Sequence, residues 1–189
     1  TQIVAKGLDF SNVTLVGVIN ADTSLNIPDF RSSENTFSLL SQVAGRSGRS
    51  EKSGEVIIQT FNPDHYAISY TKMHDYNGFY KKEMEIRRTL KYPPFYYLCH
   101  IKISGKEMEY VSKEAEKIKR ALTRNLVNCS ILGPTPSTIF RVNNIYRFGI
   151  ILKYKQEDKL KDTLEKVIEH YKGNGKIRID IDFNPSQIY

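Results

Sequence analysis

The first third of the chain has the apolar pattern of a strand, a helix and a second strand. The run from Val13 to Asp22 is almost continuously apolar, which is typical of a strand covered on both faces. Apolar residues recur at helical spacing over residues 33–43, and the run from Gly54 to Phe61 again resembles a buried strand. This order predicts two parallel strands joined by a right-handed crossover. Two strands form only part of a sheet, so we expect an open edge or a further partner.

Residues 62–93 are predicted to form a helical bridge. Asn62-Pro63-Asp64 is a helix-start signal, and aromatic and apolar residues follow it at helical spacing. Asn77-Gly78 interrupts the pattern before a second short helix over residues 79–90, and Pro93-Pro94 ends that helix.

The last part, residues 94–189, has the most regular pattern. Apolar and polar residues alternate over 97–104, 146–152 and 177–183, which predicts half-buried strands. Apolar stripes at helical spacing cover 111–122 and 160–171. A further strand begins at Ile131, is broken by Gly133-Pro134-Thr135-Pro136 and resumes over 138–142. The β-α-β-β-α-β order predicts a ferredoxin-like α+β domain, with one antiparallel sheet and two helices on one face. The expected domains are therefore 1–61, a linker over 62–93, and 94–189.

Charge separates these parts. The 189 residues carry a net charge of +7 and a pI of about 9.3. Residues 1–60 contain five Lys and Arg against six Asp and Glu, whereas residues 61–189 contain 23 against 15. The second part is therefore the expected site for a polyanionic partner. The chain has no run of 18 apolar residues and no signal-peptide pattern at its start.

The most informative motif is QVAGRSGR, residues 42–49, directly after the first predicted helix. Gly45 and Gly48 allow a backbone to approach a phosphate closely. The guanidinium groups of Arg46 and Arg49 match phosphate oxygens in a bidentate geometry. Such an arginine can act as an arginine finger that neutralises a transferring phosphoryl group. The alternative is a basic helix cap in a loop rich in Gly and Ser.

A second candidate motif is AKGLDF, residues 5–10, directly before the first strand. Lys6 and Gly7 can hold a nucleic-acid phosphate, and Asp9 can orient neighbouring groups or meet an arginine of the first motif. The alternative is a polar loop with a helix-capping Asp.

Taken together, the two motifs and PDFR (residues 28–31) between them resemble the end of the second RecA-like lobe of superfamily-two helicases. More closely, the chain resembles the family of primosomal replication-restart DNA helicases. The resemblance covers essentially the whole chain and continues through YPPF (92–95), LGPTP (132–136), IYRFGIILK (145–153) and IDIDFNP (179–185).

The resemblance implies an ATP-dependent 3′–5′ DNA helicase that recognises stalled or branched forks and restarts replication by primosome assembly. It implies ATP and Mg²⁺ in the full-length enzyme, and zinc only in an upstream part. The implied partners are forked or single-stranded DNA, single-strand-binding protein and other primosome proteins. The implied location is the bacterial cytoplasm, at the nucleoid. The family's C-terminal domain resembles a ribosomal small-subunit protein fold.

The resemblance also implies roles for individual residues. It assigns helicase motif V, which couples DNA contact to nucleotide state, to Lys6, Gly7, Leu8 and Asp9. It assigns motif VI to Gln42, Gly45, Arg46, Gly48 and Arg49. In motif VI, Gln42 and the arginines face the ATP phosphates. Arg49 is the predicted finger, and Arg46 is the alternative.

The chain also departs from a complete helicase. It has no G-x-x-x-x-G-K-[ST] loop, no acidic Walker-B strand and no paired C-x-x-C zinc ligands. It also begins without Met, so we expect a C-terminal fragment whose first lobe lies upstream. The polypeptide by itself is expected to bind DNA without hydrolysing ATP.

DNA-binding candidates in the basic part mix cations with an aromatic ring that can stack on bases. They lie around the Gly-Pro loop and on the strand after it: Arg141, Tyr146, Arg147 and Lys153. Further phosphate contacts are expected from Lys102, Lys176 and Arg178. The alternative is that these charges only solvate exposed faces. At the level of the whole chain, the alternative is a non-enzymatic nucleic-acid-binding module.

We expect no metal site and no hydrolase triad. Cys99 and Cys129 are too few for a thiolate zinc site and are expected to be buried thiols. Asp180-x-Asp182-x-Asn184 mimics the start of a calcium loop, but it lies in a predicted strand and is followed by proline. The four histidines are scattered without ligand spacing.

Overall fold

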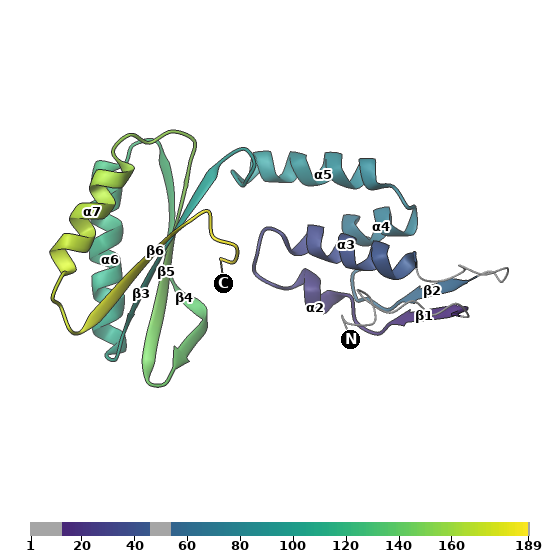
Figure 1. Cartoon of the computed structure of the whole chain (residues 1–189), viewed down its shortest axis with the longest axis horizontal. Coiled ribbons are helices and arrows are strands. Elements are labelled where there is room, and N and C mark those ends of the chain that lie inside the picture. The colour runs from purple at the N-terminus through teal and green to yellow at the C-terminus, as the bar shows by residue number, and fades with distance from the viewer. Residues whose placement is uncertain (1–12, 46–53, 189) are drawn as a thin grey trace. The chain divides into compact units, whose positions relative to one another are not determined.

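The computed structural model describes residues 13–45 and 54–188, and the chain divides into two compact units, 1–86 and 87–189 (Figure 1). Unit 1 contains β1 (Leu15–Val18), α2 (Asp22–Leu25), α3 (Ser32–Ala44), β2 (Glu55–Ile58), α4 (Tyr66–Lys72) and most of α5 (Tyr76–Thr89). Unit 2 contains β3 (Tyr97–Gly105), α6 (Met108–Asn125), β4 (Cys129–Val142), β5 (Ile145–Tyr154), α7 (Leu160–Tyr171) and β6 (Ile177–Phe183). In the described residues no helix is both long and apolar enough to cross a bilayer.

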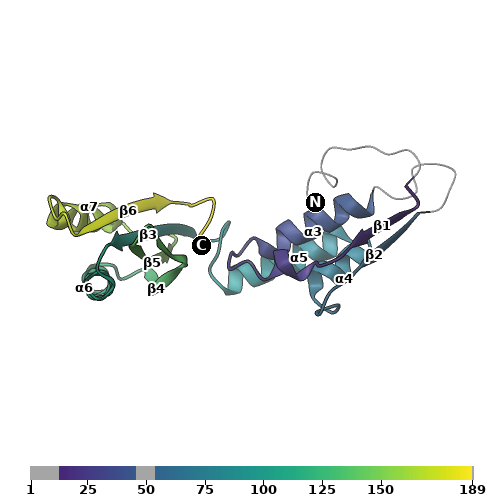
Figure 2. The ribbon, with the colours of Figure 1, turned by 90° about the horizontal axis from the view of Figure 1, so that it is seen from below.

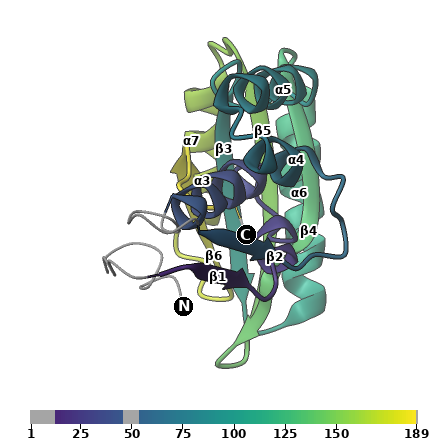
Figure 3. The ribbon, with the colours of Figure 1, turned by 90° about the vertical axis from the view of Figure 1, so that its right-hand side faces the viewer.

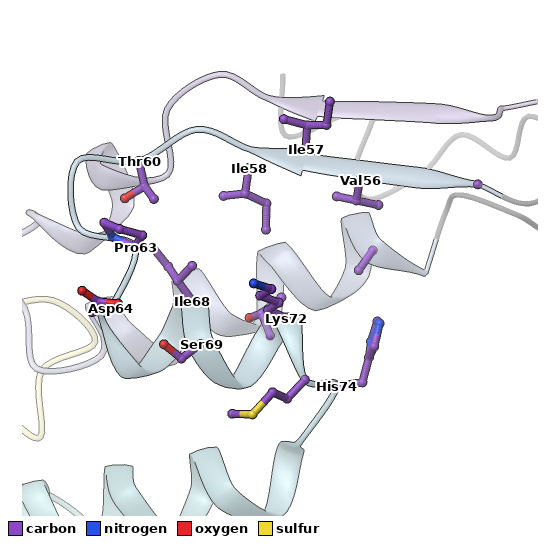
Figure 4. A pocket seen from close by; sticks show the side chains of 14 residues that line it. Val56, Ile57, Ile58, Thr60, Pro63, Asp64, Ile68, Ser69, Lys72 and His74 are labelled. Carbon is purple, nitrogen blue, oxygen red and sulfur yellow. The ribbon is translucent and has the colours of Figure 1, made fainter.

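The sheet of unit 1 confirms the predicted parallel pairing. β1 and β2 run parallel, with Val16 opposite Val56 and Val18 opposite Ile58. α3 and α4 lie on one side of this sheet, as Figures 1 and 3 show. The expectation that both faces are covered is wrong for the described residues. Ile57 points away from the helices (Figure 4), and the strand register puts Leu15 on the same side of the sheet. Leu15 and Ile57 are 57% and 53% exposed, because α3 and α4 cover one face only.

Two features connect the elements of unit 1. The Asp22 carboxylate accepts hydrogen bonds from Thr60 Oγ1 at 2.9 Å and from the Phe61 amide at 3.0 Å, which ties α2 to the segment after β2. The Phe61 hydrogen bond also lowers the pKa of Asp22. On the other side of the helices, Phe37 of α3 stacks on Phe79 of α5 with ring centroids 4.0 Å apart. The four-residue helix α2 was not predicted, because a single turn is too short for a periodic pattern.

Unit 2 is built on an antiparallel sheet of strand order β4-β5-β3-β6. α6 and α7 pack on the same face, where their apolar stripes meet alternate residues of the two central strands (Figures 1 and 2). This core includes Cys99, Ile101, Ile103, Val111, Ile118, Leu122, Ile150, Leu152, Leu160 and Leu164. Burial raises the pKa of the Cys99 thiol to about 12, so it is an unreactive core residue, as predicted.

The strand expected to break at the Gly-Pro segment is continuous. β4 runs through residues 133–136, with register shifts between Leu132 and Thr135 and between Pro136 and Arg141. β4 is an edge strand, where proline costs no ladder hydrogen bond on the solvent side. The prolines therefore produce irregular pairing, and β4 remains part of the sheet.

The sheet face opposite α6 and α7 is here called the open face. Its side chains are more buried than the alternating apolar and polar residues of the strands predicted. On β3 it carries Leu98, which is fully buried, and His100, which is 4% exposed. The segment after β6 returns to β3. There the Asn184 amide donates to the Leu98 carbonyl at 2.8 Å, and the Leu98 amide donates to Asn184 Oδ1 at 3.2 Å. The half-buried strand expected over 97–104 is therefore covered on both faces along part of its length.

Gly149 of β5 provides a test of packing on the open face. A Cβ added there would lie 2.8 Å from His100 Nε2, and the imidazole is too buried to move freely. We expect Gly149→Ala to lower the free energy of unfolding by about 1–3 kcal/mol in urea denaturation. Gly175→Ala is the control, because an added Cβ there meets nothing within 4 Å. Equal unfolding midpoints for the two variants would contradict the packing described here.

Candidate nucleic-acid interface

The β4–β5 hairpin ends in a cation stacked over an aromatic ring. Arg141 lies opposite Tyr146 in the strand register, and its guanidinium carbon is 5.2 Å from the ring centroid. Arg141 Nη2 also donates to Asn144 Oδ1 in the turn. Asn143 and Asn144 both have positive φ, as a tight two-residue hairpin turn requires. The turn and the stack hold Arg141 and Tyr146 in a defined position at the hairpin tip.

Phe140 supports this tip. Its ring packs edge-on against Tyr146 at 5.5 Å and against Phe148 at 5.7 Å. Phe148 belongs to the core of unit 2, so the aromatic contacts continue from the core to the exposed tip. A half-exposed ring beside a guanidinium can stack on a base while the cation meets a phosphate. Phe140 was not among the predicted candidates.

The open face brings a second set of predicted cations together. Ser104 of β3 pairs with Arg147 on one side and with Arg178 on the other, so the two arginines flank it on the same face. Arg178 donates to the Asp180 carboxylate at 2.7 and 2.9 Å, and this pair raises the pKa of Arg178. Lys102 lies one cross-strand row away, opposite Asp180. Successive strand residues face opposite sides, so Arg147 and Tyr146 belong to different surfaces.

Two of the predicted DNA-binding lysines, Lys176 and Lys153, already contact other groups of the protein. Lys176 Nζ lies 3.6 Å from the Glu107 carboxylate and 5.4 Å from the Tyr110 ring centroid. Lys153 is 6% exposed, in contrast to the exposed strand position that its predicted DNA contact assumes. Its ammonium donates to the Leu90 carbonyl at 2.9 Å and lies 3.4 Å from the centroid of the Tyr92 ring. Burial, with a smaller contribution from the nearby Lys91 charge, lowers the pKa of Lys153.

His100 occupies the middle of the open face. Its Nδ1 is buried and has no hydrogen-bond partner among the described residues. Burial lowers the pKa of His100, Lys102 lowers it further and Asp182 opposes the shift. His100 is therefore neutral at physiological pH and adds no positive charge to this face.

In unit 1, the structure describes two of the predicted nucleotide-site residues. Gln42 is exposed in the last turn of α3. Gly45 caps the C-terminal end of α3, and its amide donates to the Ser41 carbonyl at 3.1 Å. The other predicted residues of the two motifs lie outside the described residues: Lys6, Gly7, Leu8, Asp9, Arg46, Gly48 and Arg49. The roles of all these residues stay predictions.

A pocket of about 920 Å³ lies beside β2 in unit 1 (Figure 4). Val56 and Ile58 point from β2 toward α4, where Ile68 and Lys72 face them, whereas Ile57 points away. The lining mixes aliphatic side chains with polar ones such as Ser69, Lys72 and His74, and it contains neither Gln42 nor Gly45 of the predicted nucleotide site. The described residues also contain no group of three His, Cys, Asp or Glu that could hold a metal ion.

One sequence signal for this interface was missed. Between Glu116 and Glu157 the chain has no Asp or Glu but contains eight Lys or Arg residues. This stretch includes all of β4, the turn and β5. A search for long segments without carboxylates would have selected the hairpin, together with Phe140 and Lys155.

Comparison with known proteins identifies similar sequences. The family described as "Primosomal protein N C-terminal domain" matches residues 88–186. The chain is 52% identical to the replication restart protein PriA of Bacillus subtilis, over 98% of this chain and 24% of that protein. It is 37% identical to PriA of Borreliella burgdorferi over 98% of this chain and 28% of that protein. It is 39% identical to PriA of Synechocystis over 100% of this chain and 22% of that protein.

The chain therefore spans about a quarter of the length of these relatives. Among solved structures, a de novo designed protein, Foldit4, matches 49% of the chain with a TM-score of 0.39 and 12% identity. That likeness is too weak to inform the fold.

The buried His100 predicts a pH effect on stability. Its folded-state pKa lies below the unfolded value of about 6.5, so below that pH the unfolded chain binds a proton that the folded chain does not. We expect the free energy of unfolding to fall as the pH drops from about 6.5 to 5. His65, whose pKa burial also lowers, contributes in the same direction. In urea titrations at several pH values, His100→Gln should show a smaller decrease than the wild type. An identical pH dependence would contradict the assignment.

Proposed function

The chain belongs to the family of the primosomal protein N C-terminal domain, and we propose that it forms the C-terminal part of a DNA helicase that restarts replication. The single observation behind the proposal is the match of the whole chain, at up to 52% identity, to proteins named replication restart protein PriA. The proposed activity of the complete protein is ATP-dependent 3′–5′ unwinding at stalled or branched forks, followed by primosome assembly. The chain would supply part of the motor and a DNA-binding domain.

Unit 2 is the proposed DNA-binding domain, with a ferredoxin-like arrangement. Its β-α-β-β-α-β order and its strand order β4-β5-β3-β6 support this fold assignment. Arg141 and Arg147 would neutralise phosphates from the two sides of the hairpin, and Tyr146 would stack on a base. The hairpin has no carboxylate to repel DNA, which supports this placement.

Unit 1 is proposed to be the end of a RecA-like lobe, and its parallel β1–α3–β2 arrangement supports this. The described residues include no phosphate-binding loop, so another part of the complete protein would hold ATP and Mg²⁺. Arg49, with Arg46 as the alternative, would then meet the γ-phosphate beside Gln42. Lys6 and Asp9 of the other motif would couple this contact to DNA. Zinc would also belong to another part of the protein.

The proposed partners follow from the same family assignment. They are forked or single-stranded DNA, single-strand-binding protein and other primosome proteins, in the bacterial cytoplasm at the nucleoid. The alternative function is a non-enzymatic nucleic-acid-binding module. The concentration of positive charge in residues 61–189 agrees with both functions, so the two differ only in the role of the arginine motif.

Reversing the hairpin charges tests DNA binding. We expect Arg141→Glu with Arg147→Glu to weaken binding of a labelled oligothymidylate in a fluorescence titration. Loss of two phosphate contacts should also reduce the slope of log K against log salt by about 1.4, since each contact to a single strand contributes about 0.7. Lys113→Glu with Lys119→Glu, on α6, makes the same charge change away from the hairpin and should keep the wild-type slope. An unchanged slope in the hairpin variant would count against this interface.

Replacing Arg49 tests the motor role in the full-length protein. We expect Arg49→Ala to reduce DNA-stimulated ATP hydrolysis by about 10³–10⁵-fold, the range known for arginine fingers, with DNA affinity unchanged. Arg49→Lys should not restore the rate, because an ammonium lacks the bidentate geometry. Lys52→Ala is a neighbouring control with the same charge change. Wild-type ATPase activity in Arg49→Ala would exclude Arg49 as the arginine finger and would favour the non-enzymatic alternative for this chain. Robust ATP hydrolysis by the isolated chain would instead contradict the expectation that another part of the protein holds the nucleotide.

A further inference from the structure

A second basic site lies at the end of β5 away from the hairpin tip. A pocket of about 470 Å³ opens there, within unit 2. It is here called the lysine pocket and is lined by Lys91, Tyr96, Ser130, Lys153 and Lys155, among others. These residues come from the segment before β3, from the start of β4 and from the end of β5. Of the DNA contacts predicted from the sequence, Lys153 lines this pocket, whereas Arg141, Tyr146 and Arg147 do not.

Neutral groups position the three ammonium groups. Lys91 Nζ donates to Ser130 Oγ at 3.3 Å, and Lys153 Nζ donates to the Leu90 carbonyl at 2.9 Å. Lys91 and Lys155 both approach the Tyr96 ring, at 6.0 and 5.1 Å from its centroid. Ring faces attract cations but leave their charge in place. The arrangement therefore concentrates positive charge without neutralising it.

Carboxylates contribute little to this pocket. In the described part of the chain, none of the three lysines forms an ion pair with a carboxylate. The nearby Glu157 uses its Oε2 to accept the Asn128 amide at 2.9 Å and does not line the pocket. Lys91 and Lys153 are close enough for repulsion to affect Lys153. An anion bound between them would relieve that repulsion.

We propose that the lysine pocket binds a phosphate group of a nucleic-acid backbone. The inference rests on the proposed function, because it extends the same DNA-binding domain. Ammonium groups bind phosphate oxygens as compact, strongly hydrated point charges, and three of them converge on this pocket. The pocket is also continuous with the first interface, since Arg147 and Lys153 lie on the same face of β5.

The spacing fits a nucleic-acid backbone. Arg147 and Lys153 are six positions apart in the strand, which corresponds to about 20 Å along β5. This distance spans several nucleotides of a nucleic-acid backbone, since even a duplex strand has only one phosphate per about 3.4 Å of helix axis. A strand lying along this face of β5 would thus contact Arg147 at one end and the lysine pocket at the other.

Substituting the two exposed lysines tests the pocket in the 189-residue chain. We expect Lys91→Gln with Lys155→Gln to weaken oligothymidylate binding by at least about tenfold. The slope of log K against log salt should also decrease by about 1.4. Lys91→Arg with Lys155→Arg should restore both quantities, because charge is the property required. Lys113→Gln with Lys161→Gln, on the two helices, is the matched control and should bind as the wild type does.

A second measurement identifies the ligand chemistry. Lysine side-chain NMR signals of Lys91, Lys153 and Lys155 should shift on addition of inorganic phosphate and of oligothymidylate. If an oligoaspartate peptide shifts these signals and the nucleotide does not, the pocket binds an acidic protein partner and the proposal is overturned.

The two proposals fail differently. If Arg141→Glu with Arg147→Glu weakens DNA binding and Lys91→Gln with Lys155→Gln does not, the lysine pocket is excluded and the DNA-binding function stands. If neither pair of substitutions weakens binding, both proposals are wrong.

Discussion

The proposed binding surface of unit 2 depends on the burial of the opposite sheet face beneath two helices. The apolar stripes of α6 and α7 meet Ile101, Ile103, Ile150 and Leu152, and this contact leaves alternate residues of the same strands on the other face. Arg147 faces outward because Phe148, its neighbour in the chain, belongs to the core. The position of each cation is therefore a consequence of the apolar packing, as a shift of one residue would exchange the two faces.

Rigid supports for the proposed contacts come from the same packing. The hairpin tip is connected to the core through Phe140 and Phe148, and Lys153 is fixed by Tyr92 and the Leu90 carbonyl. Long cationic side chains lose rotamer entropy when they bind a ligand, so prior ordering reduces that cost. Side chains held in this way by rings and carbonyls, with no competing carboxylate partner in the described structure, keep their charge for an anion.

In unit 1, helices also bury one face of a sheet, but the other face is more exposed. α3 and α4 cover one face of β1–β2, while Leu15 and Ile57 on the other face remain more than half exposed. The chain spans about a quarter of its relatives, and the proposed motor needs a nucleotide held by another part of the protein. The exposed aliphatic side chains agree with a lobe that other segments complete.

The sequence by itself determined the order and nearly all of the elements, because helical and strand periodicities are local; α7 and β6 match their predicted ranges. It also supplied the family and the candidate residues Arg141, Tyr146 and Arg147. The tertiary structure decided that Lys153 is buried, that His100 is covered and that Phe140 supports the tip. It also joined Lys91 to Lys155, residues 64 positions apart, across one pocket. Such contacts depend on the register of paired strands and on which distant segments cover a sheet face. Neither can be predicted from a local sequence pattern.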